Sequence, residues 1–167
     1  MKKLLYIVFI LGILTLQNCG IYSFTGGSVG DAKTIQINYF LNNASYVEPS
    51  LSNVFIRALE NRFLQQTNLN LVKSGGDLFL TGEITDYRIT PTAATADQKA
   101  AQNRLIIRVK VHFENRLDEE KNFDKTFSHF YEYPADKLLV GSILEEAYNV
   151  ILERITQDIF NEALAQW

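Results

Sequence analysis

The chain has few of the residues that build metal sites and cross-links. One cysteine, Cys19, and two histidines, His112 and His129, occur among its 167 residues. A lone cysteine excludes a disulfide within the chain, and the common zinc ligand sets are out of reach except as a sparse site of histidine and carboxylate groups. We therefore expect no bound metal and no other dissociable cofactor.

Groups arranged for catalysis are scarce as well. The acidic pairs Glu119-Glu120 and Glu145-Glu146 are adjacent in sequence, so they diverge on a helix or lie in a turn. Two carboxylates that face one bond, as in a glycosidase, need a different arrangement. His112 falls on a predicted strand and His129 lies among aromatic residues, where a surface or packing role is the simpler interpretation. We predict that the protein is not an enzyme.

Positive charge is in deficit. The formal net charge is −3, and it becomes −5 if Lys2 and Lys3 are removed with a leader peptide. No global basic field then remains to attract the phosphates of DNA or RNA. We do not expect nucleic acid as a partner.

Only one apolar run is long, and it lies near the N-terminus. Lys2 and Lys3 precede an uncharged segment from Leu4 to Leu16, which has the order of an export signal. This segment is too short for a membrane-spanning helix, which needs about 20 apolar residues. We predict a signal peptide over residues 1–18.

The residues after this run resemble the lipobox of bacterial lipoproteins. Leu16-Gln17-Asn18-Cys19 ends on the cysteine that is acylated in such proteins and becomes their new N-terminus, with Asn18 where glycine, alanine or serine is usual. Several acyl chains on Cys19 would hold the protein at a membrane, because each buried methylene contributes about 0.8 kcal/mol. Gly20 stands where an aspartate is associated with retention in the inner membrane. The sequence thus favours a lipid anchor on the periplasmic side of the outer membrane.

The mature part is predicted to contain a glycine-rich lipidated tether over residues 19–32 and a single domain over residues 33–167. Period-two alternation predicts a strand over Lys33–Phe40, with Ile35, Ile37 and Tyr39 on one face. Apolar residues at helical spacing predict helices over Ser50–Gln66 and from about Leu138 to Leu164. Further strands are expected over residues 69–72, 77–89, 104–113 and 122–133, the first two joined as a hairpin, and residues 91–102 are expected to form a long exposed loop.

This order of elements predicts an α+β fold. We expect a two-layer sandwich in which a mainly antiparallel sheet of four to five strands carries two helices on one face. Strands joined by hairpins exclude a doubly wound parallel sheet. No internal repeat and no boundary of a second domain is visible.

The predicted strand over residues 104–113 has one basic face. Arg104, Arg108, Lys110 and His112 share that face, interrupted by Ile106, at steps of about 6 to 7 Å between alternate residues. Such a ladder suits the phosphates of an anionic glycolipid or the acidic lining of a partner. The alternative is a solvated face paired with acidic neighbours, for which Glu83 and Asp124 are candidates. Both interpretations stay open at this point.

Short segments along nearly the whole mature chain resemble the LptE family, the lipopolysaccharide-assembly outer-membrane lipoproteins. They are Cys19–Gly26, Tyr39-Phe40, Asn42–Ala44, Ala58-Leu59, Arg62-Phe63, Gln66–Leu69, Gly75–Leu78, Gly82–Ile84 and Asn103–Leu105. These segments are typical of sequences in the family and are not catalytic motifs. Their order and spacing make the resemblance fairly specific.

The resemblance implies a function in the outer membrane. The domain would plug the lumen of a large β-barrel of the LptD type, help that barrel assemble, receive lipopolysaccharide and deliver it to the outer leaflet. Family members bind lipopolysaccharide through basic residues, but no motif places those residues here. Arg104, Arg108 and Lys110 are therefore a hypothesis from the strand pattern alone. The alternative function is a pilotin-like assembly lipoprotein for another outer-membrane pore, which would bind a protein and no lipid.

Overall fold

The computed structural model describes residues 29–46, 48–92 and 101–164. The predicted signal peptide, Cys19, most of the predicted tether and most of the predicted loop over residues 91–102 lie outside the described residues. The described elements are β1 (Thr34–Ile37), β2 (Leu41–Asn42), α2 (Leu51–Gln66), β3 (Asn70–Leu71), β4 (Leu78–Thr92), β5 (Gln102–Asn115), the 3-10 turn η2 (Glu119–Lys121), β6 (Phe123–Pro134) and α3 (Ser142–Leu164).

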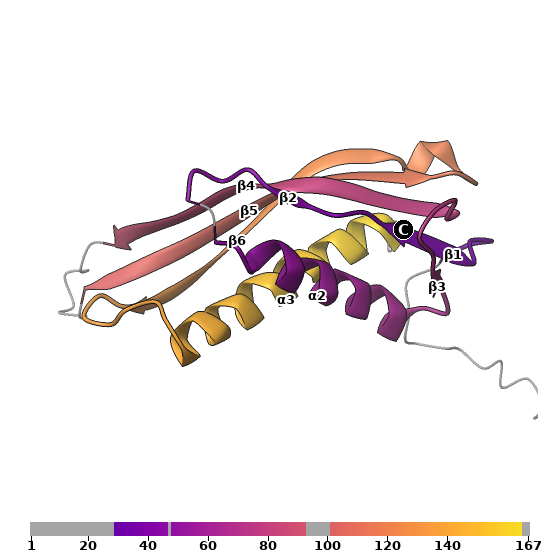
Figure 1. The fold of residues 1–167 in the computed structure, drawn as a ribbon. Helices are drawn as coiled ribbons and strands as arrows, with labels where there is room; N and C mark the ends of the chain where they lie inside the picture. The colour runs from indigo at the N-terminus through magenta and orange to yellow at the C-terminus, as the bar shows by residue number, and fades with distance from the viewer. Residues whose placement is uncertain (1–28, 47, 93–100, 165–167) are drawn as a thin grey trace, which may run out of the picture.

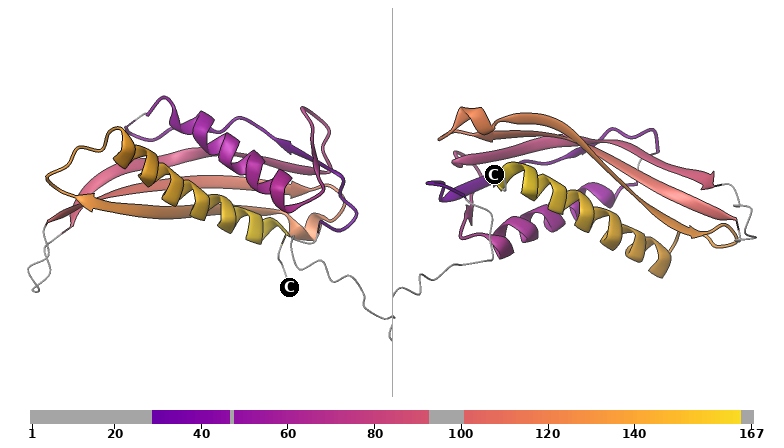
Figure 2. Two further views of the ribbon diagram at one scale, coloured as in Figure 1. Left: turned by 90° about the horizontal axis from the view of Figure 1, so that it is seen from below. Right: turned by 180° about the vertical axis from the view of Figure 1, so that it is seen from behind.

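The strands form one sheet, and both helices lie on the same face of it (Figure 1). The strand order is β3-β1-β4-β5-β6, with β2 beside β4. The long strands β4, β5 and β6 are antiparallel, whereas β1, β2 and β3 run parallel to their neighbours. Seen from below, α2 and α3 lie side by side across the sheet (Figure 2). The predicted two-layer α+β fold is confirmed, although the sheet is mixed and has six strands instead of four to five.

The predicted hairpin between residues 69–72 and 77–89 is wrong. β1 lies between β3 and β4 and pairs in parallel with both. The crossover through α2 brings β3 back beside β1, and the turn at Gly75, whose φ is +71°, then takes the chain to the other side of β1. Gly76 passes so close to β1 that an added Cβ would stand 2.7 Å from the Gln36 nitrogen.

Two predicted boundaries also differ from the structure. α3 begins at Ser142, after Gly141 in a left-handed conformation (φ +56°), and not near Leu138. The alternation of β1 ends at Ile37, so Tyr39, expected on the face of Ile35, is 56% exposed.

One hydrophobic core fills the space between the sheet and the helices. Both predicted helices contribute apolar residues at helical spacing to this core. The main contributors are Leu78, Leu80 and Ile84 from β4, Leu105, Ile107, Val109, Val111 and Phe113 from β5, Phe55, Leu59 and Phe63 from α2, and Ile151, Ile155 and Ile159 from α3.

Gly82 on β4 makes room in this core for Phe40. The Phe40 ring is fully buried and packs edge-on against Phe55 with ring centroids 5.0 Å apart. A Cβ at Gly82 would overlap the carbonyl oxygen of Lys110 and stand 2.6 Å from the Phe40 ring. The close approach of β4, β5 and Phe40 therefore requires glycine at this position.

We predict that Gly82→Ala lowers the free energy of unfolding by about 1 to 3 kcal/mol, the usual cost of overpacking a filled core. Urea denaturation monitored by circular dichroism measures this change. Thr81→Ala, one residue earlier on the opposite face of β4, is the matched control and should lie within about 0.5 kcal/mol of the wild type. Equal stability of the two variants would contradict the packing role of Gly82.

Asp77 fixes the start of β4 to the start of β1. Its Oδ2 accepts hydrogen bonds from the backbone N–H of Lys33 (2.9 Å) and Thr34 (3.0 Å) and from the Thr34 hydroxyl (2.8 Å). The Asp77 N–H in turn donates to Thr34 Oγ1 at 2.9 Å. The Lys33 N–H and then the Thr34 hydroxyl hold the pKa of the Asp77 carboxyl below its usual value.

We predict that this pKa shift makes stability depend on pH. Because the folded-state pKa is lowered, the contribution of Asp77 is present above the carboxyl pKa of the unfolded chain, about 3.9, and is lost as the pH falls through the folded value. Asp77→Asn should be less stable than the wild type at pH 7, and the difference should shrink in acid. Urea unfolding between pH 2 and pH 7 tests this, and a difference that is constant with pH would contradict it.

Candidate functional site

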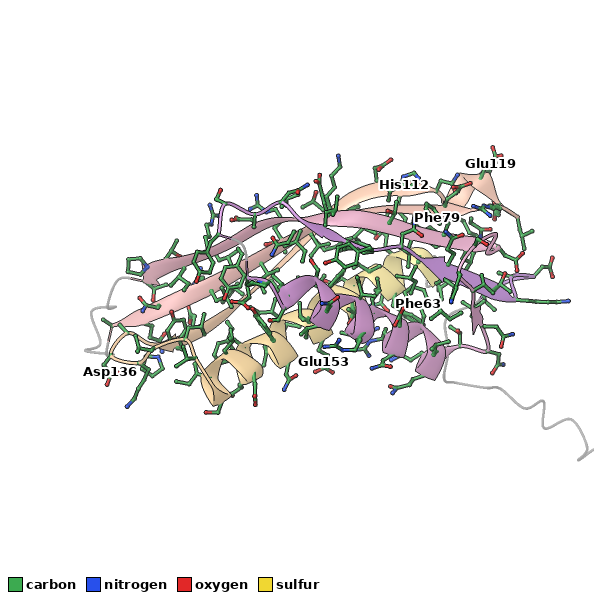
Figure 3. The ribbon with its side chains drawn as sticks, viewed as in Figure 1. Phe63, Phe79, His112, Glu119, Asp136 and Glu153 are labelled. Atoms are coloured by element: carbon green, nitrogen blue, oxygen red, sulfur yellow. The ribbon has the colours of Figure 1, made fainter. Side chains whose placement is uncertain are left out.

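The face of the sheet without helices carries the predicted basic ladder on its central long strand, β5. Along β5 the buried residues alternate with Arg104, Ile106, Arg108, Lys110 and His112, which face away from the core. In Figure 3, His112 projects on the side opposite the helices. The sequence prediction that these basic residues share one face is confirmed by this alternation.

Each basic residue of the ladder has an acidic residue directly opposite it on a neighbouring strand. The pairs in register are Arg104 with Glu132, Arg108 with Asp86, Lys110 with Glu83, and His112 with Asp124. Glu83 and Asp124 are the neighbours that the sequence predicts, whereas Asp86 and Glu132 are additional partners that the structure reveals. Opposite charges at facing positions stabilise antiparallel strands.

Two of the four basic residues are engaged by these neighbours. Arg104 donates from Nε (3.0 Å) and Nη2 (2.6 Å) to Glu132 Oε1, and its guanidinium lies 4.2 Å from the centroid of the Phe130 ring. His112 Nδ1 lies 3.2 Å from Asp124 Oδ1. An anionic ligand at either residue would have to displace a carboxylate.

Arg108 and Lys110 are different, because the carboxylates opposite them are engaged elsewhere. Asp86 pairs with Arg88 on its own strand at 3.2 Å, and Glu83 accepts a hydrogen bond of 2.6 Å from Asn43. Within the described part of the chain, neither Arg108 nor Lys110 has a carboxylate within ion-pair distance, and both side chains are exposed. Two adjacent cations are thus available to an anionic ligand on the open face.

Lys110 also borders a shallow hollow of about 250 Å³. Its other lining residues come from β2, β4, β5 and β6 and are Leu41, Thr81, Gly82, Glu83, His112 and Asp124. Leu41 is 59% exposed and gives the hollow an apolar margin beside the lysine. A ligand that carries both a phosphate and a hydrocarbon part would find matching groups here.

A larger hollow of about 680 Å³ lies at the end of the sheet near the start of α3. Tyr46 stacks on Tyr87 in its wall with ring centroids 5.5 Å apart, and Ile89 and Val140 line it with exposed apolar groups. Beside Tyr87 in the core, burial and then Tyr87 itself raise the pKa of the Tyr148 hydroxyl above its usual value. No sequence pattern predicts this hollow, because its lining comes from three separate segments without a motif.

Among the residues that the structure describes, no group of three or more His, Cys, Asp or Glu side chains is placed to hold a metal ion. Residues 26–30 spell Gly-x-Ser-x-Gly, the pattern of a hydrolase nucleophile elbow, but that motif joins a strand to a helix. Here the next element is the strand β1.

A helix that crosses a bilayer needs about 20 predominantly apolar residues. Neither α2 nor α3 is both long enough and apolar enough to do so. α3 has 23 residues but carries five acidic side chains and one arginine.

The model of the LptE family, described as lipopolysaccharide-assembly, matches residues 32–163. The chain belongs to the LptE family. LptE proteins are non-catalytic assembly lipoproteins of the cell envelope that associate with lipopolysaccharide and with LptD. The predicted family is thereby confirmed, and with it the general assignment of this LptE-family chain to lipopolysaccharide assembly.

Solved structures with a similar fold differ widely in sequence. A hypothetical protein from Chlamydia trachomatis superposes with a TM-score of 0.54 at 9% identity, covering 81% of this chain and 99% of that one. A minor lipoprotein from Acinetobacter baumannii (TM-score 0.47, 13% identity) covers 78% and 91%. The rare lipoprotein B from Shewanella oneidensis (TM-score 0.45, 16% identity) covers 76% and 89%. No curated protein sequence matches the LptE-family chain.

Proposed function

We propose that this LptE-family protein is a lipid-anchored component of the lipopolysaccharide translocon in the outer membrane. In this role it plugs the lumen of an LptD-type β-barrel, helps the barrel assemble and passes lipopolysaccharide to the outer leaflet. The observation that carries the proposal is the family match over residues 32–163, which covers every described strand and helix except Leu164, the last residue of α3.

Cys19 is the proposed attachment site of the lipid. It lies outside the described residues, and its support is the order of basic residues, apolar run and cysteine at the N-terminus. An acylated Cys19 would hold the domain at the periplasmic surface of the membrane, with the residues up to β1 as a tether.

We predict that Cys19→Ala abolishes incorporation of radiolabelled palmitate and releases the protein into the soluble periplasmic fraction. The physical reason is that no other apolar group of the mature chain replaces several acyl chains as an anchor. Membrane fractionation with palmitate labelling measures both effects, and a labelled, membrane-bound variant would reject Cys19 as the lipid site.

The proposed lipopolysaccharide contacts are Arg108 and Lys110, with Arg104 as a further contact. The first two are exposed neighbours whose opposite carboxylates are held by Arg88 and Asn43. Arg104 would contribute only by exchanging the Glu132 carboxylate for a phosphate. This difference makes Arg108 and Lys110 the main candidates.

The mechanism needs no chemical step. Cationic side chains compete with divalent ions for the phosphates that hold lipopolysaccharide aggregates together, and they form charge-assisted hydrogen bonds to the freed lipid. The exposed Leu41 beside Lys110 offers apolar surface to the same molecule. Because the chain is acidic overall, with a formal net charge of −3, the attraction is confined to this local pair of cations.

We predict that Arg108→Ala combined with Lys110→Ala weakens lipopolysaccharide binding about tenfold, which corresponds to about 1.4 kcal/mol, and leaves barrel association intact. Binding to immobilised lipopolysaccharide at fixed salt concentration measures the effect. Arg57→Ala with Lys73→Ala removes the same charge from exposed positions on α2 and in the turn after β3, and serves as the matched control. Unchanged affinity of the first double variant would reject the role of the ladder.

The barrel partner is tested by affinity purification of the protein, tagged after Trp167, from detergent-solubilised outer membranes. A large β-barrel recovered at about one to one, together with lipopolysaccharide, is the expected result. Recovery of a different outer-membrane pore without lipid would overturn the proposal and favour the pilotin-like function.

A further inference from the structure

β6 forms one border of the sheet, beside α3 (Figure 2). It pairs with β5 on one side, and within the described residues no strand pairs with its other side. The strand is 12 residues long, and its ladder with β5 has no register shift between Phe123 and Pro134. A long, regular edge of this kind leaves a row of backbone groups without partners in the sheet.

The register shows which backbone groups face outward. The Ala135 N–H donates to the Ala101 carbonyl at 3.0 Å, and these two residues are directly opposite in the register of β5 and β6. Since bonded and non-bonded pairs alternate in an antiparallel ladder, the odd-numbered residues of β6 bond to β5. The peptide groups of the even-numbered residues therefore point to the free edge. They belong to Asp124, Thr126, Ser128, Phe130 and Glu132.

On the other side of the sheet, β4 is unpaired only beyond the stretch that β1 and β2 cover, and this part is protected in two ways that β6 lacks. The β4 ladder has a bulge between Ile84 and Asp86, and Pro91 occupies a position whose nitrogen faces away from β5. Bulges and prolines of this kind block the addition of further strands. β6 has no bulge and no proline before its last residue, Pro134.

α3 holds β6 in place from the covered face of the sheet. Lys125 Nζ lies 2.6 Å from Glu162 Oε2, and His129 Nε2 lies 2.6 Å from Asp158 Oδ2. These two contacts attach the strand to the helix, and they lie four residues apart on both elements. An incoming segment would meet an edge that is already ordered, which reduces the entropy lost on binding.

The charge around the edge selects the kind of segment that fits. Asp124 and Glu132 are held by His112 and Arg104 of β5, but β6 and α3 together carry seven acidic residues against Lys125 and Arg154, so the charge beside the edge is negative. A second copy of the chain fits poorly, because antiparallel pairing of two β6 strands about Ser128 would place Asp124 opposite Glu132. It would also bring two acidic α3 helices together. An extended segment with basic residues at its ends has complementary charge.

We propose that the free edge of β6 is a docking site for an extended, basic segment of a partner protein, which joins the sheet as a seventh strand. Backbone hydrogen bonds to the even-numbered residues supply the affinity, and the excess of acidic over basic side chains on β6 and α3 supplies the charge preference. The site is separate from Arg108 and Lys110, which lie on β5, so it stands independently of lipopolysaccharide binding.

The test uses the full lipidated chain in detergent micelles and the synthetic peptide Lys-Val-Thr-Val-Thr-Val-Thr-Val-Lys, whose two lysines point to the same face and lie as far apart as residues 124 and 132. Amide hydrogen exchange followed by NMR should show new protection at Thr126, Ser128 and Phe130 when the peptide is added. The amides of Phe127 and His129 already bond to β5, and their protection should stay nearly unchanged. Protection confined to any other strand, or no binding at millimolar peptide, would overturn the proposal.

Substitutions in the protein and changes to the peptide distinguish binding through the backbone of the β6 edge from binding through side chains. Ser128→Pro removes one outward N–H without breaking the ladder to β5 and should weaken peptide binding at least tenfold, whereas Ser128→Ala keeps the N–H and should bind as the wild type. A peptide methylated on all internal amide nitrogens tests the same bonds with the unaltered protein and should not bind. The analogue with glutamate at both ends should bind more weakly. If Ser128→Pro binds the peptide as the wild type does, and the methylated peptide binds as the unmodified one does, the β6 edge is not the site. If the glutamate analogue binds as tightly as the lysine peptide, the preference for a basic segment is rejected.

Discussion

Because both helices cover the same face of the sheet, every long strand has to divide its side chains between a core and an open surface. β5 shows this division most clearly, since its apolar residues are buried at every second position and its basic residues stand between them. A shift of one residue in its register would bury Arg108 and Lys110 and expose Val109 and Val111. The placement of the candidate site is therefore fixed by the same alternation that builds the core.

The electrostatics of the open face follow from competition among neighbours. Every basic residue of the ladder faces a carboxylate, and yet only Arg104 and His112 are held by theirs. The carboxylates of Asp86 and Glu83 turn to Arg88 and Asn43 instead. A face whose opposite charges are nearly balanced in number can thus still present a local pair of cations. Such a pair favours selective contact with an anion over general attraction of anionic surfaces.

The sequence was sufficient for the parts of the fold that depend on local period. α2, α3 and the three long strands show clear alternation or helical spacing, and the structure contains each of them. The pairing of β3 could not be predicted in the same way, because it depends on the path through α2 and on the close passage of Gly76 beside β1. Alternation in the sequence predicts the ladder residues, but it does not predict the ion pairing of each one with a carboxylate. That pairing depends on Arg88, Asn43 and Glu132, which come from other strands or loops and become neighbours only in the folded sheet.

The position of β1 between β3 and β4 also bears on the order in which the chain folds. β4, β5 and β6 are consecutive and pair with their nearest neighbours in sequence, so their contacts form after short loops close. β1 reaches its place only when Thr34 meets Asp77, 43 residues further along the chain. Long-range contacts of this kind form late, because loop closure costs entropy before any contact repays it. The long antiparallel strands can thus assemble first, and the segment nearest the proposed lipid anchor can dock later. Tethering at the N-terminus would therefore leave the formation of most of the sheet unimpeded.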